Sequence, residues 1–547
     1  MSITEKLLRE KFSTLSEEHI LDSTSVNQRY ASNTLGETFT FDCGISLSNT
    51  SEIKVLLALA IEHNFEVHTV SSGKNWGYGS ITKATERAQV LLDLSQMNRI
   101  TAVDKELGLI SVEPGVTQQQ LYEYLQVNNW NYMVPVTGAG PQCSILSNAL
   151  ERGYGITPHT DHFAAVNKMS AIIPNEKFWN EDQENGFIYK SAIDDLDLSK
   201  DKFIDHTFKW GLGSYVEGLF TQSSMAVVTQ ITIRLAAKPE SFASFYIKIK
   251  KHEKLPQAIA FIKETLRDFE GIVGSINLMD RRRVLSMVSE NPNGRGAHQN
   301  MSDPQIEELS RLNEASEWLI AGSIYGKREV VKAVKKLLVK EAKFAEQIIF
   351  SDGLLIKVGK FLSNHLPLKS LRSAKEQLQA LEEGIDIMLG KPQQVALPLA
   401  YWRNPRVTPD KKRLMNPDKD ECGLLWYAPL IPMNVNKIQE FVDFIRSTTP
   451  KYNIEPLITF TNLRYDCIDS TIPLIFDVQN PVAKQNAHDC LNELYEEGRK
   501  RGFVPYRMNV KQQKECLSPE HMHWKVVKAI KNVLDPHNVL QANRYNP

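Results

Sequence analysis

A glycine-rich turn early in the chain has residue types that suit the binding of an anion. Residues 65–70 alternate as a strand does, and they lead directly into the turn, which reads Ser71-Ser72-Gly73-Lys74-Asn75-Trp76-Gly77-Tyr78-Gly79. Glycine reaches positive φ and lets backbone N–H groups approach an anion closely, which is how such loops cradle phosphate. The spacing matches neither the dinucleotide fingerprint nor a Walker loop. Taken alone, the turn is either a phosphate cradle or a tight structural bend.

Two further glycine clusters lie before residue 240. Gly138-Ala139-Gly140 precedes residues 143–149, and Gly211-Leu212-Gly213 precedes residues 218–222. Three such clusters in one half of the chain favour a single large phosphate-bearing cofactor over three unrelated turns.

The elements that position these clusters alternate irregularly. Apolar residues at helical spacing predict a helix over residues 51–64 with a cap at Asn49 or Thr50, and Thr117 caps a predicted helix over residues 118–127. Residues 89–94 and 109–112 have the composition of strands. Because the strands are short and mixed, the pattern predicts an α+β fold and not a doubly wound sheet.

The second half of the chain has a different pattern. A clean alternation predicts a strand over residues 241–249, and an amphipathic helix follows over residues 257–269. Another strand is predicted at residues 474–478, before a helix over residues 486–501. With 547 residues the chain exceeds the size of one hydrophobic core, so at least two domains are expected.

The composition excludes several classes of protein. A formal net charge of -1 argues against binding to nucleic acid or to a membrane surface. The longest apolar run, residues 55–61, is too short to cross a bilayer, and residues 1–12 lack a signal-peptide core, so a cytoplasmic protein is expected. The 6 cysteines have no metal-ligand spacing, so we expect reduced thiols and no metal site.

Four segments, in order, resemble motifs of one known family, the vanillyl-alcohol oxidase and p-cresol methylhydroxylase flavoproteins. Residues 71–80 are similar to the family's FAD pyrophosphate loop, G-[RK]-N-x-G-Y-G-G, with Ser80 in place of the last glycine. Residues 147–162 resemble G-N-A-x-E-R-G-x-G-x-T-P-x-x-D-H, and residues 213–225 resemble G-P-Y-x-D-G-L-F-S-Q-S-N. Residues 535–540 give the fourth match, while the middle third of the chain matches only weakly.

The resemblance implies a two-part FAD-binding domain of the PCMH type in an α+β fold, with an inserted α/β cap domain that covers the substrate. The expected boundaries are residues 1–240 for the FAD-binding domain, 241–500 for the cap and 501–547 for a C-terminal segment that returns to the FAD-binding domain. The positions that match the family's cofactor contacts are Ser72, Gly73, Lys74, Asn75, Gly77, Tyr78, Gly138, Ser144, Asn148, Gly153, Asp161, Asp469 and Arg544.

The resemblance also implies a reaction. In this family a hydride passes from the benzylic carbon of a 4-alkylphenol or 4-hydroxybenzyl alcohol to the flavin, and a p-quinone methide results. Tyr78, Tyr506 and Arg507 match the residues that bind the phenolate, since hydroxyl donors and a buried guanidinium favour the charged form of a phenol. Asp161 matches a carboxylate that assists hydride transfer and guides attack on the quinone methide, although a turn-capping role is its alternative. Arg544 would offset negative charge on the reduced flavin.

The chain departs from the family where FAD is often attached covalently through a His or Tyr. Residues 457–477 resemble the strand beside that position and contain no His, and Asp469 or Ser470 stands opposite it. Asp469 could form an ester to the flavin 8α-methyl group. We expect no histidyl link, and we expect non-covalent FAD in preference to the ester. Pro473 lacks an N–H, so the strand either begins after it or lies at a sheet edge.

Two other functions stay open. One is a flavin enzyme of the same fold that acts on a non-phenolic alcohol, a hydroxy acid or a natural-product intermediate; the other is a flavin-binding subunit without turnover. The presence of Asp161 and the phenolate-binding set argues against both. The expected partners are a small phenolic substrate and oxygen or another electron acceptor, with neither nucleic acid nor membrane. The resemblance implies a homodimer or larger assembly, and it does not separate oxidase from dehydrogenase.

Overall fold

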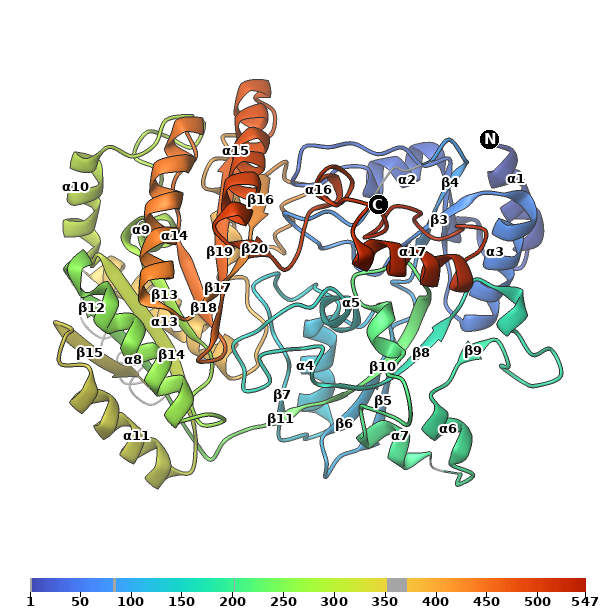
Figure 1. The fold of residues 1–547 in the computed structure, drawn as a ribbon, viewed down its shortest axis with the longest axis horizontal. Helices are drawn as coiled ribbons and strands as arrows, with labels where there is room; N and C mark the ends of the chain where they lie inside the picture. The colour runs from blue at the N-terminus through green and yellow to red at the C-terminus, as the bar shows by residue number, and fades with distance from the viewer. Residues whose placement is uncertain (1, 82–84, 201, 352–370) are drawn as a thin grey trace.

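The protein consists of two halves that lie side by side, each built around its own β-structure (Figure 1). The structure is a computed structural model, and it describes residues 2–81, 85–200, 202–351 and 371–547. The N-terminal half contains the strands up to residue 237, whereas the second half is organised around one large sheet formed by residues 241–505. Among the described residues, no helix combines the length and the apolar character that crossing a membrane requires.

The first sheet of the N-terminal half carries the glycine-rich turn. Its strand order is β1 (Ile20–Asp22), β2 (Cys43–Ser46), β4 (Gln89–Asp93), β3 (Glu66–Val70), and β4 pairs in parallel with both β2 and β3. Helix α3 (Thr50–His63) packs its apolar side into the core of this sheet; it begins at the predicted cap Asn49, whose side chain accepts a hydrogen bond from the Glu52 N–H. Strand β3 ends at Val70, so the turn begins where the sheet ends.

The second sheet of this half is antiparallel and carries the second motif. Its order is β5 (Ile100–Asp104), β6 (Leu109–Val112), β10 (Val227–Arg234), β8 (Val166–Ile172), β9 (Ile188–Tyr189). Helix α4 (Gln118–Val127) begins with the predicted Thr117 cap, which forms a capping box with Gln120. The short helix α5 (Ile145–Leu150) follows the second glycine cluster. The smaller elements are α1 (Ile3–Lys11), α2 (Ser23–Tyr30), β7 (Tyr132–Met133), α6 (Ala192–Leu196), α7 (Phe203–Thr207) and β11 (Ala236–Ala237).

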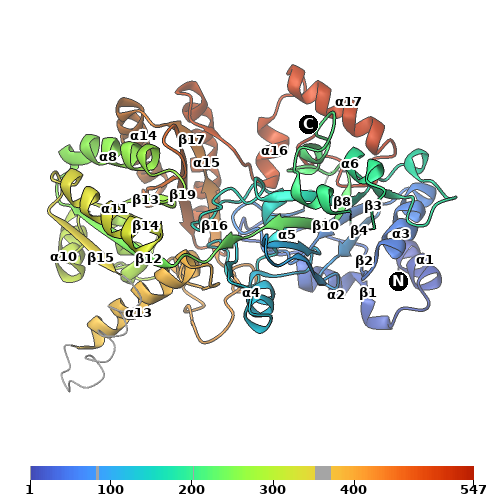
Figure 2. The same ribbon diagram turned by 90° about the horizontal axis from the view of Figure 1, so that it is seen from below.

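The second half is built on a single sheet, with α8 (Leu255–Asp268), α11 (Arg328–Glu341) and α14 (Val435–Thr448) on one face and α13 (Leu371–Met388) on the other (Figure 2). The strand order is β15 (Gln347–Ser351), β12 (Ser241–Ile249), β14 (Trp318–Gly326), β13 (Ile276–Asp280), β18 (Thr459–Asn462), β19 (Cys467–Phe476), β17 (Pro429–Pro432), β20 (Val504–Pro505), and β16 (Gly423–Tyr427) also pairs with β19. The apolar core lies between this sheet and α8, α11, α14 and α15 (Pro481–Lys500). Further helices are α9 (Arg281–Val288) and α10 (Asp303–Asn313).

Strand β19 runs through Pro473, so of the two alternatives the strand does not begin after this residue. The reason is local: at Pro473 the strand is paired with β16 through Trp426, whereas its pairing with β18 ends at Thr471. The missing N–H therefore falls on a stretch of β19 with one ladder partner among the described strands, which satisfies the sheet-edge alternative.

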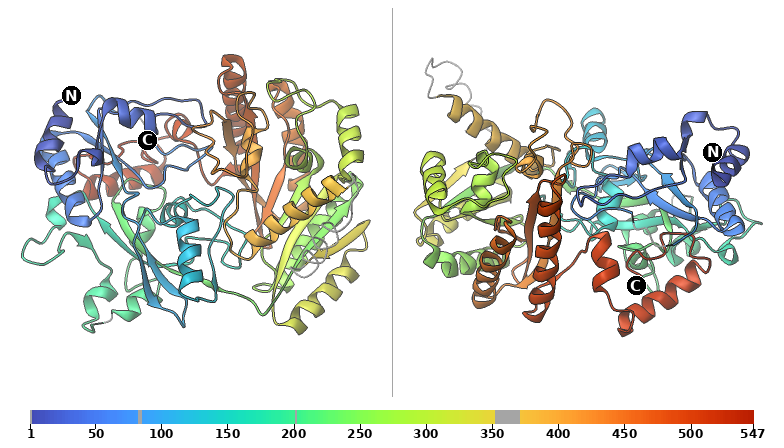
Figure 3. Two further views of the ribbon diagram at one scale, coloured as in Figure 1. Left: turned by 180° about the vertical axis from the view of Figure 1, so that it is seen from behind. Right: turned by 90° about the horizontal axis from the view of Figure 1, so that it is seen from above.

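The C-terminal residues leave the large sheet and pack on the N-terminal half, where Figure 3 shows both chain ends. Helices α16 (Val510–Cys516) and α17 (Met522–Leu534) follow β20. The buried ammonium of Lys531 donates to Asp535 Oδ2 (2.6 Å), to the Leu540 carbonyl (2.9 Å) and to the Ser224 carbonyl. Beyond α17, the Val67 N–H donates to the Val539 carbonyl over 2.7 Å, so the last residues extend the first sheet beside β3.

A short N-terminal segment, residues 33–36, connects the two halves. Leu35 is fully buried and belongs to the core of the large sheet, although its neighbours in sequence belong to the N-terminal half. The Thr34 carbonyl accepts from the Leu424 N–H of β16 over 2.9 Å, while the Thr34 hydroxyl oxygen accepts from the Gly77 N–H of the glycine-rich turn over 2.7 Å. Thr34 therefore links the turn to the large sheet, in addition to the contact of Gly77 with Trp426.

Candidate functional site

The glycine-rich turn is closed by Asn75. Its backbone carbonyl accepts from the Gly79 N–H (2.9 Å), and its side-chain amide donates to the Gly79 carbonyl (2.7 Å). Gly73, Gly77 and Gly79 have φ of 67°, 80° and 74°, a region that favours glycine. At Gly77 a Cβ atom would also overlap the Trp426 indole, so this position needs glycine for two reasons.

Lys74 brings a positive charge to this turn. Burial lowers its pKa, and nearby Asp418 opposes that effect. Burial raises the pKa of Asp418 to about 7, so Asp418 neutralises Lys74 only in part at neutral pH. Ser72 and Gly73 are half-buried beside it. The turn therefore offers an ammonium group to an anion such as a phosphate.

The second motif packs against the turn, since the Ser71 and Ser147 hydroxyls lie 2.5 Å apart. Ser144 caps α5 by accepting from the Ser147 N–H. A Cβ atom on Gly153 would overlap the Asn148 side chain, whose amide group contacts His162 Nδ1. A Cβ atom on Gly138 would lie 3.2 Å from Ala396, which brings the second half close to the second glycine cluster.

Unpartnered polar atoms in this region fit a bound polar cofactor. His162 is buried, its Nδ1 is engaged by Asn148, and its Nε2 has no hydrogen-bond partner among the described residues. The same holds for Gln541 Oε1, although the amide nitrogen of Gln541 donates to the Ser80 carbonyl at the end of the turn. Buried polar atoms normally have partners, so a group such as FAD that brings donors and acceptors suits the site.

Tyr78, Arg507 and Tyr506 come together where the turn meets the C-terminal segment. The Arg507 guanidinium carbon lies 4.1 Å from the centroid of the Tyr78 ring, and Arg507 also donates to Asn75 Oδ1 over 2.7 Å. The backbones of the two segments are also hydrogen-bonded, because the Val510 N–H donates to the Tyr78 carbonyl. The Tyr506 ring packs edge-on against Tyr154 with 5.5 Å between centroids.

Glu151 connects Arg507 to Arg544, and the sequence analysis gave it no role. One carboxylate oxygen contacts Arg544, and the other lies 3.3 Å from Arg507. Burial alone would raise the pKa of Glu151, but the two guanidinium groups outweigh it and hold that pKa below its usual range. Burial opposes the charge of Arg507 too, yet Glu151 raises its pKa overall. The only sequence feature that could have pointed to Glu151 is its position inside the second motif, residues 147–162.

Asp469 belongs to the same cluster. It is 6% exposed, and burial raises the pKa of its carboxyl to about 8 despite Arg507 and a hydrogen bond from Tyr506. Burial, together with Asp469, raises the pKa of Tyr506 well above its ordinary value. Burial likewise raises the pKa of Tyr78, with Arg507 opposing it. At neutral pH the cluster therefore holds two guanidinium cations, one carboxylate and an Asp469 that is mostly protonated, so it has an excess positive charge.

Asp161 lies at the border of this cluster. Its Oδ1 accepts from the Ala164 N–H over 2.9 Å, so it does cap a turn. It also pairs with Tyr154 in an isolated bridge, and its charge helps burial raise the pKa of Tyr154 to about 12. Through Tyr154, which contacts Tyr506, Asp161 is one residue away from the cluster of Tyr78, Tyr506 and Arg507.

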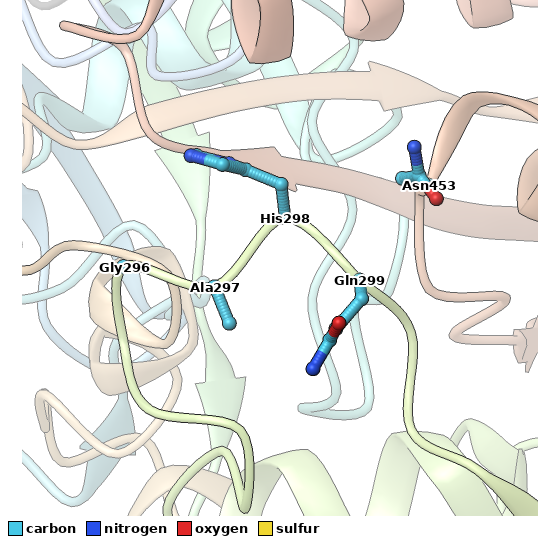
Figure 4. Close-up of a pocket in the computed structure, with 5 residues that line it drawn as sticks. All are labelled: Gly296, Ala297, His298, Gln299 and Asn453. Atoms are coloured by element: carbon cyan, nitrogen blue, oxygen red, sulfur yellow. The ribbon is translucent and has the colours of Figure 1, made fainter.

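A pocket elsewhere on the second half contains none of the predicted site residues. It has a volume of about 440 Å³ and is lined by Gly296, Ala297, His298, Gln299 and Asn453 (Figure 4). The His298 side chain meets the Asn480 amide at 2.8 Å.

Comparison with known proteins identifies the fold and the cofactor. Residues 42–179 match the FAD binding domain family. The chain is 26% identical over 96% of its length to 1'-carboxy-chondrochloren decarboxylase of Chondromyces crocatus, covering 94% of that protein. It is 24% identical over 91% of its length to the flavoprotein subunit of 4-cresol dehydrogenase [hydroxylating] of Pseudomonas putida, covering 87% of that protein.

Solved structures share the whole architecture. Substrate-bound p-cresol methylhydroxylase superposes with a TM-score of 0.82 at 21% identity, and 4-ethylphenol oxidase from Gulosibacter chungangensis with a TM-score of 0.83 at 19% identity. Each comparison covers 100% of this chain and 98% of the other. The expected fold and cofactor are thereby confirmed. The chain is an FAD-dependent oxidoreductase with the PCMH-type FAD-binding fold, homologous to the flavoprotein subunit of 4-cresol dehydrogenase.

Proposed function

We propose that the protein oxidises a 4-alkylphenol or 4-hydroxybenzyl alcohol at its benzylic carbon, by way of a p-quinone methide. The observation that carries this proposal is the buried cluster in which Tyr78, Tyr506 and Arg507 converge with an excess positive charge. A buried site of this kind favours the anionic form of a phenol, whose ordinary pKa is about 10. One relative is named for its action on 4-cresol, and one structural neighbour is a 4-ethylphenol oxidase.

The chain's own residues divide the work. The hydroxyls of Tyr78 and Tyr506 donate to the phenolate oxygen, and Arg507 supplies the charge that keeps the phenol ionised. FAD, when bound, would supply the acceptor for the hydride that leaves the benzylic carbon. Asp161 polarises the region around that carbon and can take a proton from a water molecule that adds to the quinone methide. Arg544, already positioned by Glu151, offsets negative charge on the cofactor side.

The test is anaerobic mixing of the holoenzyme with a panel of 4-alkylphenols and 4-hydroxybenzyl alcohols while flavin absorbance is followed. We expect bleaching by the phenols and none by their O-methyl ethers, which cannot form a phenolate. Bleaching of the flavin by lactate or sugars, but by none of the phenols, would contradict the proposal. Repeating the bleaching experiment in air separates an oxidase from a dehydrogenase.

A second reaction on the same site is oxidative decarboxylation, favoured by the relative named as a decarboxylase. Hydride loss from the benzylic carbon of a 4-hydroxyphenyl compound gives a quinone methide. A carboxylate on the next carbon then leaves as CO2, and its bonding electrons form the new C=C bond while the ring returns to a phenolate. A 3-(4-hydroxyphenyl)propanoate substrate distinguishes the two reactions, because decarboxylation yields CO2 and a 4-vinylphenol, and simple oxidation does not.

We further propose that FAD is held without a covalent bond. An ester needs an ionised Asp469 as nucleophile, and burial keeps this carboxyl protonated at neutral pH by raising its pKa to about 8. Denaturation in acid should release the flavin. If the flavin stays attached in wild type and is released from Asp469→Ala, the ester is correct instead.

A further inference from the structure

The large sheet turns a polar row of side chains toward the N-terminal half. The pairing registers place Asn277 opposite Thr461, and Thr461 opposite Asp469, on the three neighbouring strands β13, β18 and β19. Directly opposed residues in a sheet project from the same face. Beyond Asp469 the next residue opposite in the sheet is the apolar Leu430. Beyond Asn277 the row continues through Ala321 to Tyr246.

This face meets the FAD-binding half, and α13 covers its other end, where the Tyr325 hydroxyl donates to the Met388 carbonyl over 2.8 Å. Tyr325 lies four residues along β14 from Ala321 and thus on the same face, and its hydroxyl also donates to the Ile156 carbonyl over 3.2 Å. Asp469 itself belongs to the candidate site, beside Tyr506 and Arg507. The opposite face of the sheet packs against the apolar core. The polar row therefore lies on the face that is not part of this core.

Several polar atoms of this row lack partners although they are buried. Among the described residues, no hydrogen-bond partner exists for Asp469 Oδ1, for Asn277 Oδ1 or for the hydroxyl of Ser275, which lies two residues before Asn277. Asp469 is 6% exposed and Ser275 is 3% exposed. Leaving such a group unpaired costs about 1–3 kcal/mol, so three together point to a ligand that supplies the missing bonds.

From this arrangement we infer that the row from Asp469 through Thr461 to Asn277 binds the side chain of a substrate that carries its own hydrogen-bond donors. The inference rests on the proposed oxidation of a phenol and names the substrate class. Tyr78, Tyr506 and Arg507 hold the phenol end. The row extends from there across two strand spacings, roughly 10 Å from Asp469 to Asn277. Because Asn277 Oδ1 only accepts, and the Ser275 hydroxyl can accept or donate, the complementary group is a hydroxyl or an amide N–H and not an alkyl chain.

The test uses two phenols of equal side-chain length, 4-butylphenol and 4-(3-hydroxypropyl)phenol, with flavin reduction as the readout in the holoenzyme. Wild type should reduce its flavin with both and should prefer the hydroxylated compound at least ~10-fold in the second-order rate constant, since a site with buried polar groups rejects a substrate that leaves them unpaired. In Asn277→Leu, a nearly isosteric change, that preference should fall at least ~10-fold.

Ser244→Ala is the matched control, because the Ser244 hydroxyl is on β12 two residues from Tyr246 and already donates to the Ser351 carbonyl. It should keep the preference. Thermal unfolding separates function from folding: removal of an unpaired Asn277 group should not lower Tm. Equal rates for the two phenols in wild type, or an unchanged preference in Asn277→Leu, would overturn the inference alone. Failure of both phenols to reduce the flavin would overturn it together with the proposed function.

Discussion

At the scale of single residues, Glu151 determines how much charge the site can offer to a substrate. It is shared by Arg507 and Arg544, so the three groups together keep an excess of positive charge. Asp469 preserves this excess only while it is protonated, because its ionised form would stand beside the phenolate. Under the proposed function, phenolate binding would therefore depend on the balance of charge within this one buried cluster.

Arg507→Gln removes the charge that favours a bound phenolate. We expect the second-order rate constant for flavin reduction by a phenol to fall about 10²–10³-fold, as when a donor to a developing or bound anion is lost. Arg499→Gln is the control, since Arg499 is half exposed and pairs with Glu496 on α15. Weaker binding of the phenol, with binding of its O-methyl ether unchanged, identifies the lost group as a phenolate ligand. Equal weakening for the two compounds would contradict this role.

Asp469 also makes stability depend on pH. Its pKa is raised to about 8 in the folded protein, whereas the ordinary value is 3.8. The folded protein thus holds the proton more tightly than the unfolded chain, and stability falls as pH rises between these two values, by at most about 6 kcal/mol. Thermal unfolding between pH 5 and pH 8 should show a smaller loss of Tm in Asp469→Asn than in wild type. Parallel curves for the two proteins would disprove the shift.

At the scale of elements, two segments hold the candidate site in shape. The glycine-rich turn is fixed by its own hydrogen bonds and by close contact with β16. Helix α17 is fixed to the N-terminal half by Lys531, which lies buried with Asp535 and donates to two carbonyls from different segments. The residues that follow α17 include Arg544, so the helix positions part of the candidate site.

Lys531→Met should destabilise the protein strongly. It leaves Asp535 as a buried carboxylate without its cation, which typically costs about 3–5 kcal/mol. The matched control is Lys525→Met on the same helix, because the ion pair of Lys525 with Glu520 is exposed and is worth less than about 1 kcal/mol. Denaturant unfolding measures both. Equal losses in the two variants would show that Lys531 does not fasten the helix.

Gly77→Ala tests the turn. The new methyl group would overlap Trp426 in addition to straining a backbone with φ 80°, so we expect the purified variant to lose most of its FAD. Gly502→Ala supplies the control, since Gly502 has φ 84° but open space around it and should bear the backbone strain alone. The ratio of flavin to protein absorbance is the readout. Retention of FAD in Gly77→Ala would show that the Trp426 side chain moves aside to accommodate the methyl group.

At the scale of the whole molecule, the two halves share a core through Leu35. This side chain is fully buried among residues of the large sheet, next to Val510 of the C-terminal segment. Leu35→Ala should cost about 2–5 kcal/mol by leaving a cavity. Because Thr34 holds the glycine-rich turn, flavin fluorescence should rise in the same thermal transition as the loss of circular dichroism. Two separate transitions would mean that the halves unfold independently.

The sequence predicts those parts of the molecule that are encoded locally. The caps Asn49 and Thr117 follow from short stretches whose residue types determine their conformation. The FAD cofactor follows from the resemblance of four ordered motifs to a known family, and a local pattern alone left the glycine-rich turn undecided. The contacts of Glu151 and Asn277 could not be predicted in this way. They depend on which distant segments the fold brings together, such as residue 151 with residue 544, and no local pattern specifies that pairing.

The Thr34 bridge has a consequence for the order in which the protein is made. The ribosome completes the glycine-rich turn long before Leu424, whose N–H anchors Thr34, and before Arg544 and the residues that extend the first sheet. A nascent chain therefore has the flavin-binding motif but lacks the contacts that hold its shape. Flavin capture should follow release of the full-length chain, and prematurely terminated products should leave the ribosome without cofactor.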